Sequence, residues 1–211
     1  MSVPAGPWPA LLLVGPTGSG KSPLGDEIEG RGLGGRRAVH FDFGARLRAI
    51  ASAPEASGGL TAAEIAAIRA SLATGALFED RDLPMIIKVL RAFGEARGAG
   101  PGALLVLNGL PRHARQADGL AGLVSVERVV HLEADAAVLR ERLRLDPGGD
   151  RAGRADDADE AVGRRLSDYR ERTLPLLGLY RERGVPVTTI PVTAALTAAG
   201  MYEVLEREVS T

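Results

Sequence analysis

Short apolar runs of strand length recur along the chain, and each is followed by a pattern that favours a helix. Residues 103–107 are continuously apolar, which is typical of a strand covered on both faces in a parallel sheet. Pro186 and Pro191 interrupt the last run, which predicts a place near a sheet edge. Five strands are predicted in this way, over residues 10–14, 39–43, 103–107, 126–132 and 185–192.

Between these runs, apolar residues recur at helical spacing. Thr61 and Glu64 form a capping box that predicts the start of a helix, and Gly75 ends it. Strands that alternate with helices predict an α/β fold with a doubly wound parallel sheet, which binds ligands at the carboxyl ends of its strands. The predicted helices cover residues 21–29, 44–52, 61–74, 83–96, 136–145, 159–183 and 197–209.

A phosphate-binding loop follows the first predicted strand. The spacing Gly15-x4-Gly20-Lys21-Ser22 matches the Walker A pattern, whose glycines let backbone N–H groups turn toward a phosphate chain. Lys21 is expected to reach the β and γ phosphates of ATP, and Ser22 to offer its hydroxyl to Mg²⁺. A glycine-rich turn that binds nothing is the alternative. The preceding strand favours the phosphate loop, and Pro23 is compatible with a first helical turn.

Composition narrows the function classes further. The net charge of −1 and pI near 6.3 argue against a dedicated nucleic-acid or membrane-surface protein. Of the 26 basic residues only Lys21 and Lys88 are lysines, so one of the two stands where a phosphate loop needs it. Cysteine is absent, which excludes disulfides and thiolate metal sites. The chain shows no signal-peptide pattern, and a single cytoplasmic domain over residues 1–211 is expected.

A polar segment over residues 146–158 separates two predicted helices. Gly148 and Gly149 can supply hinge freedom, and Arg151 and Arg154 can reach phosphates when the segment closes. We therefore predict a mobile lid. A disordered linker is the alternative.

Together these features resemble the adenylate kinase family of nucleoside monophosphate kinases, in its short-lid form. The resemblance implies a P-loop NTPase-type five-stranded parallel sheet flanked by helices, with a helical flap that binds the nucleoside monophosphate. It implies a core (10–42, 103–145 and 160–211), a flap (about 43–95) and a lid (about 146–158). Five motifs carry it, at 15–22, 44–49, 75–83, 108–116 and 154–180.

The resemblance also implies roles for particular residues. Arg48 and Arg112 match the arginines that hold the acceptor phosphate, since a guanidinium offers two parallel donors. Gln116 matches the glutamine that reads the acceptor base. The implied site consists of ATP-binding Gly15, Thr17, Gly18, Ser19, Gly20, Lys21, Ser22 and Arg142, AMP-binding Gly44, Arg48, Phe78, Gly109, Arg112 and Gln116, catalytic Lys21, Arg112, Arg151, Arg154 and Arg165, and metal-binding Ser22 and Asn108 (through water).

Each assignment has a structural alternative. Arg142 can belong to a solvated helix face, Arg165 can pair with a nearby glutamate, and Gln116 can cap a helix. The three histidines show no mutual metal-ligand spacing.

Some residues depart from the family pattern. Asn108 stands where the family has an aspartate that holds the waters of Mg²⁺, so the magnesium site is expected to be weaker, with Asp42 as a possible substitute carboxylate. Phe43 replaces a small hydroxyl residue at the acceptor site. Arg151 is our hypothesis for a lid arginine that the family places where Asp146 stands.

The resemblance implies that the chain, as a monomer, transfers the γ-phosphoryl group of ATP to AMP with Mg²⁺, which gives two ADP. Two alternatives stay open. One is a kinase for CMP, UMP or a small alcohol, and the other is an adenine-nucleotide sensor with weakened chemistry, which Asn108 would favour.

Overall fold

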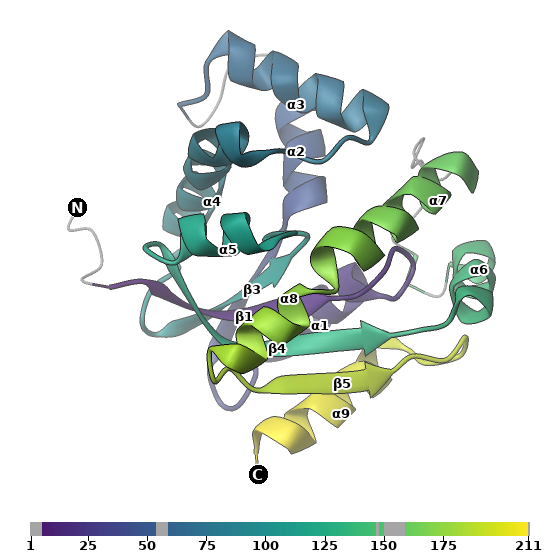
Figure 1. Ribbon diagram of the computed structural model, residues 1–211. Helices are drawn as coiled ribbons and strands as arrows, with labels where there is room; N and C mark the ends of the chain where they lie inside the picture. Colours follow the sequence, from purple (N-terminus) through teal and green to yellow (C-terminus); the bar gives the residue numbers. More distant parts are fainter. Residues whose placement is uncertain (1–5, 54–58, 147, 150–158, 211) are drawn as a thin grey trace.

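The computed structural model describes residues 6–53, 59–146, 148–149 and 159–210, and these residues build a five-stranded parallel sheet (Figure 1). The strand order is β2-β3-β1-β4-β5, so β1 and its neighbour β3 lie inside the sheet and β5 lies at an edge. The predicted fold class and the edge position of the last strand are confirmed. The strands are β1 (Trp8–Val14), β2 (Arg37–Asp42), β3 (Ala103–Asn108), β4 (Val124–Glu133) and β5 (Val187–Pro191).

Helices cover both faces of this sheet. Alternate residues of β1 separate two apolar cores: Leu12 packs with the core that includes Ile86, and Leu13 packs with the core that includes Leu24. No helix in the described part of the chain is long and apolar enough to cross a bilayer. The helices are α1 (Lys21–Arg31), α2 (Phe43–Ser52), α3 (Ala62–Thr74), η1 (Asp80–Asp82), α4 (Leu83–Arg97), α5 (Ala114–Leu120), α6 (Ala136–Leu145), α7 (Asp159–Asp168), η2 (Tyr169–Thr173), α8 (Leu176–Glu182) and α9 (Ala198–Val209).

The helical pair α2 and α3 extends away from the sheet, and α3 lies furthest from it at the top of Figure 1. The predicted capping box is present at the start of α3. Thr61 Oγ1 accepts from Glu64 N (3.2 Å), and Glu64 Oε2 accepts from Thr61 N (2.7 Å). Gly75 ends the helix with φ 73°, a backbone conformation that favours glycine. The start and end predicted for this helix are therefore confirmed.

Two predicted boundaries were wrong. Phe43 does not end the second strand but begins α2, because Asp42 Oδ1 accepts from Ala45 N (2.8 Å) and caps the helix there. The first helix ends at Arg31, with Gly32 as its C-cap, within two residues of the predicted end at about Glu29. The predicted helix 159–183 is interrupted by the π-helical turn η2, in which Leu174 N donates to Tyr169 O (2.7 Å). Pro175, which has no N–H, follows this turn, and α8 begins after it.

The packing of α4 on β1 depends on a glycine. A Cβ at Gly94 would overlap the buried indole ring of Trp8. We expect Gly94→Ala to lower the free energy of unfolding by about 1–3 kcal/mol, as overpacking does. The matched control is Gly30→Ala in α1, because a Cβ at Gly30 meets nothing within 4 Å and alanine is expected to raise stability by up to about 1 kcal/mol. Urea denaturation measures both, and equal effects of the two substitutions would contradict this account of the packing.

Candidate active site

The loop between β1 and α1 has the geometry of an anion-binding turn. Gly20 is the N-cap of α1 with φ 96°, and no described side chain caps this end, so the first helical amides can meet a ligand. A Cβ at Gly15 would lie 2.7 Å from Ser19 Oγ and 2.9 Å from Leu132 O, so the close approach requires glycine. Lys21 Nζ donates to Gly15 O (2.7 Å) and to Pro16 O (2.8 Å), which holds the ammonium group against the loop.

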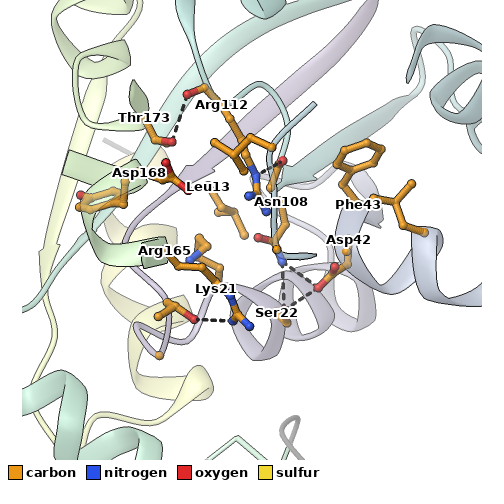
Figure 2. Close-up of a pocket in the computed structure, with 18 of the residues that line it drawn as sticks. Leu13, Lys21, Ser22, Asp42, Phe43, Asn108, Arg112, Arg165, Asp168 and Thr173 are labelled. Carbon is orange, nitrogen blue, oxygen red and sulfur yellow. Dashed lines mark hydrogen bonds between the residues drawn. The ribbon is translucent and has the colours of Figure 1, made fainter. Parts of the chain in front are cut away.

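Three polar side chains meet beside this loop, from α1, β2 and β3 (Figure 2). Ser22 Oγ donates to Asp42 Oδ2 (2.5 Å), and Asn108 Nδ2 donates to Asp42 Oδ2 (2.9 Å) and to Ser22 Oγ (3.0 Å). Burial alone would raise the pKa of the Asp42 carboxyl. The hydrogen bonds from Ser22 and Ala45 outweigh burial and bring that pKa below its ordinary value. Asp42 is therefore a carboxylate at neutral pH.

Arg112 is held by three contacts on the opposite side of the pocket. Its Nε donates to Gly109 O (3.0 Å), its backbone N donates to Gln116 Oε1 (2.8 Å), and its backbone O accepts from Thr173 Oγ1 (3.0 Å). Burial and then the nearby charge of Arg165 lower the pKa of the guanidinium. An arginine stays protonated in any case. Arg112 is therefore a fixed positive charge with its terminal nitrogens directed into the pocket (Figure 2).

The other residues predicted for the acceptor side lie in the same pocket as Arg112. Arg48 of α2 and Gly109, which has φ 80°, line the same pocket. The rings of Phe43 and Phe78 contact each other, with centroids 5.9 Å apart. Gln116 is buried, and its Nε2 donates to Phe78 O (3.2 Å) in addition to the contact with Arg112. The glutamine therefore links the main chains of two acceptor-side segments, and its role in reading a base stays a prediction.

Arg165 reaches the pocket from α7. Its guanidinium donates to Thr17 Oγ1 (3.4 Å) of the phosphate loop, and Figure 2 shows it close to Lys21. Asp168, one turn further along α7, faces Arg112 and Arg165 from the same side, and Tyr169 also lines the pocket. Burial raises the pKa of Tyr169 to about 12, and its hydroxyl lies 2.9 Å from His131 Nε2. Helix α7 thus brings a cation, Arg165, and a carboxylate, Asp168, into the pocket that the phosphate loop lines.

Arg142 of α6 is buried and binds backbone carbonyls, so it does not belong to a solvated helix face. Its Nε donates to Gly18 O (3.1 Å), and its terminal nitrogen donates to Thr193 O (2.9 Å) and Leu196 O (2.7 Å). The guanidinium therefore connects the phosphate loop to the segment between β5 and α9. A stacking role on the ATP base stays a prediction.

One pocket brings together most of the residues predicted for the site. Gly15 and Ser19 do not line it. Ser19 is fully buried and donates its hydroxyl proton to Pro16 O (2.9 Å). Arg151 and Arg154 lie outside the described residues, as do Asp156 and Asp157 of the predicted lid. The predicted residues that line the pocket are Thr17, Gly18, Gly20, Lys21, Ser22, Gly44, Arg48, Phe78, Asn108, Gly109, Arg112, Gln116, Arg142 and Arg165.

Sequence reasoning missed several residues of this pocket. Asp168 and Thr173 were not predicted, although Asp168 follows Arg165 at a helical spacing of three, which was an available signal. Thr173 had no such signal, because its contact with the Arg112 carbonyl depends on the π-helical turn. Tyr169 was likewise recognised only from the fold.

The donor set beside the loop suits a magnesium ion. Mg²⁺ prefers oxygen ligands and few protein carboxylates, and Ser22, Asp42 and Asn108 offer a hydroxyl, a carboxylate and an amide oxygen. Within the described ranges, no three His, Cys, Asp or Glu residues form a group that could hold a metal by themselves. A metal ion here would therefore take some of its ligands from these side chains and the others from a bound phosphate chain.

Comparisons with known proteins find relatives that share one name. No family model matches the chain. An adenylate kinase of Synechococcus sp. (strain WH7803) is 35% identical over 184 residues, which cover 84% of this chain and 87% of that protein. The adenylate kinase of Parasynechococcus marenigrum (strain WH8102) is 33% identical over 183 residues, with the same coverage. The adenylate kinase of Xanthomonas oryzae pv. oryzae (strain MAFF 311018) is 32% identical over 203 residues, or 93% of this chain and 95% of that one.

Proposed function

The chain belongs to the adenylate kinase family, and from that premise we propose that it transfers the γ-phosphoryl group of ATP to AMP, which gives two ADP. The family makes it a phosphotransferase with a phosphate group as acceptor. One observation carries the proposal: the phosphate loop with Lys21 and the arginine pair Arg48 and Arg112 line the same pocket. Two anions can therefore be held side by side.

Phosphoryl transfer needs placement and charge neutralisation more than covalent help. The α1 amides and Lys21 would hold the triphosphate of ATP. Arg112 would orient the phosphate of AMP, because its three backbone and side-chain contacts fix where the guanidinium points. Arg165 would stand between donor and acceptor, next to Thr17. Mg²⁺ bound beside Ser22 would neutralise charge on the β and γ phosphate oxygens.

Domain closure is part of the same proposal. The segment 43–95 would act as a flap over the acceptor, and 146–158 as a short lid over the donor, within a single domain of residues 1–211. Both closures would exclude water from the reacting phosphates, which suppresses ATP hydrolysis. Arg151 and Arg154 are proposed lid contacts. A monomer in the cytoplasm is also proposed.

A kinase for another monophosphate is the second candidate, and Phe43 favours it. This aromatic ring stands on the acceptor side, where its contact with Phe78 shapes the space for a base. A sensor without efficient chemistry would rest on Asn108. Asp42 weakens that alternative, because a carboxylate lies 2.9 Å from the Asn108 amide.

A substrate panel tests the proposal. We expect ATP with AMP to yield ADP in a coupled assay, with kcat/KM at least about tenfold higher than for CMP, UMP or GMP, because a site that hydrogen-bonds one base rejects others. Lys21→Ala serves as the blank. A higher kcat/KM for CMP or UMP would favour the second candidate. ATP and AMP binding without any ADP at high enzyme and magnesium would favour the sensor.

A further inference from the structure

The end of β2 carries a carboxylate, Asp42, directly opposite Asn108 at the end of β3. Asn108 is the position at which the family pattern has the aspartate. Asp42 and Asn108 are register partners in the β2–β3 pairing, so both side chains leave the sheet at the same edge. The two come within 2.9 Å of each other and both contact Ser22. Asp42 also lines the nucleotide pocket, as Ser22 and Asn108 do.

The two carboxylate oxygens of Asp42 accept hydrogen bonds from different groups and have different roles. Its Oδ1 accepts from Ala45 N (2.8 Å) and caps α2. Its Oδ2 accepts from Ser22 and from Asn108, and this second job is not needed for the helix cap. An asparagine would suffice as a cap, since Asn and Asp are equally good at this position. The charge of Asp42 therefore has a purpose other than starting α2.

The same bonds leave Ser22 able to bind a metal. A serine hydroxyl has one proton and two lone pairs. Ser22 gives its proton to Asp42 and accepts one hydrogen bond from Asn108, so one lone pair remains. The amide of Asn108 acts as the neutral donor to both partners. A carboxylate at that position would instead put a second negative charge next to Asp42.

We infer that Asp42, at the end of β2, is the carboxylate that holds the magnesium ion of MgATP, and that Asn108 is a positioning residue that orients it. This inference rests on the proposed function, because it requires ATP on the phosphate loop. Asn108 is then not a weakened magnesium ligand. Its neutral amide donates to the carboxylate on the neighbouring strand, and that carboxylate gives the magnesium site its negative charge.

Calorimetric titration of ATP in MgCl₂ and in EDTA tests the inference without relying on turnover. The ratio of the two dissociation constants measures how much magnesium tightens binding. In Asp42→Asn we expect this tightening to fall by at least about tenfold, as loss of metal-orienting groups does. In the double variant Asp42→Asn/Asn108→Asp the carboxylate returns on the neighbouring strand, and we expect the tightening to recover.

Asp135→Asn is the matched control. Asp135 caps α6 through the same bond, since its Oδ1 accepts from Val138 N (2.8 Å), and it does not line the pocket. Unaltered magnesium tightening in Asp42→Asn would overturn the inference. Loss in the single variant without recovery in the double variant would also overturn it, because Asp42 would then act through local structure. If the unsubstituted protein binds no ATP in either buffer, the proposed function itself fails.

Discussion

Replacing Lys21 by alanine is expected to lower kcat for ADP formation by about a thousandfold, because a preorganised positive charge on transferring phosphates contributes on this scale. Lys21 Nζ lies against the Gly15 and Pro16 carbonyls, so the ammonium is already inside the loop where the phosphates of ATP would lie. Steady-state kinetics with saturating ATP and AMP measures the change.

The chain offers a matched control for this substitution, because its other lysine lies elsewhere. Lys88 of α4 is exposed and pairs with Glu64 (2.7 Å) on the acceptor-side helices. Exposed ion pairs contribute about 0.2–1 kcal/mol to stability, so Lys88→Ala is expected to keep kcat within about twofold. If Lys21→Ala retained a tenth or more of the activity, the phosphate loop would not carry the reaction as proposed.

The second large effect is expected at Arg112. We expect Arg112→Lys to lower kcat/KM for AMP by about a hundredfold, because lysine keeps the charge but loses the forked pair of donors that orients a phosphate. Lysine would also lose the bond from Nε to Gly109 O. ATP affinity is expected to change little, because the phosphate loop, which would hold ATP, lies on another side of the pocket.

Initial rates at varied AMP, with ATP binding measured separately by calorimetry, distinguish these effects. Arg115→Lys is the control, because Arg115 follows three residues later, is 81% exposed and pairs only at the surface with Asp80 (2.7 Å). An Arg112→Lys enzyme that loses ATP affinity as strongly as AMP turnover would show that Arg112 does not serve the acceptor alone.

The sequence was sufficient for the sheet and for the phosphate loop. Apolar runs and helical spacing report burial directly, so the five strands and the Thr61 capping box could be predicted from local patterns. The π-helical turn before Pro175 could not, because π turns are rare and residues 169–173 continue the helical pattern of the segment before them. Phe43 was misassigned because Asp42 ends the strand by capping the next helix.

Site residues that belong to a sequence motif could be predicted. Contacts between residues on two neighbouring strands could not, because they depend on the strand order of the sheet. Asp42 was considered as a substitute carboxylate from the sequence, but its bonds with Ser22 and Asn108 depend on β2 and β3 being neighbours. Arg142 illustrates the opposite limit. Its position in an arginine-rich helix gave no indication of the four backbone carbonyls that surround its guanidinium.

Those carbonyls have a consequence for engineering the chain. Arg142 joins the first β–α connection, through Gly18, to the last one, through Thr193, Ala194 and Leu196. A split or circularly permuted version with new termini between β5 and α9 would cut this tie next to the phosphate loop. New termini between Gly100 and Gly102, where the surroundings are open and neither glycine lines the pocket, would leave it whole.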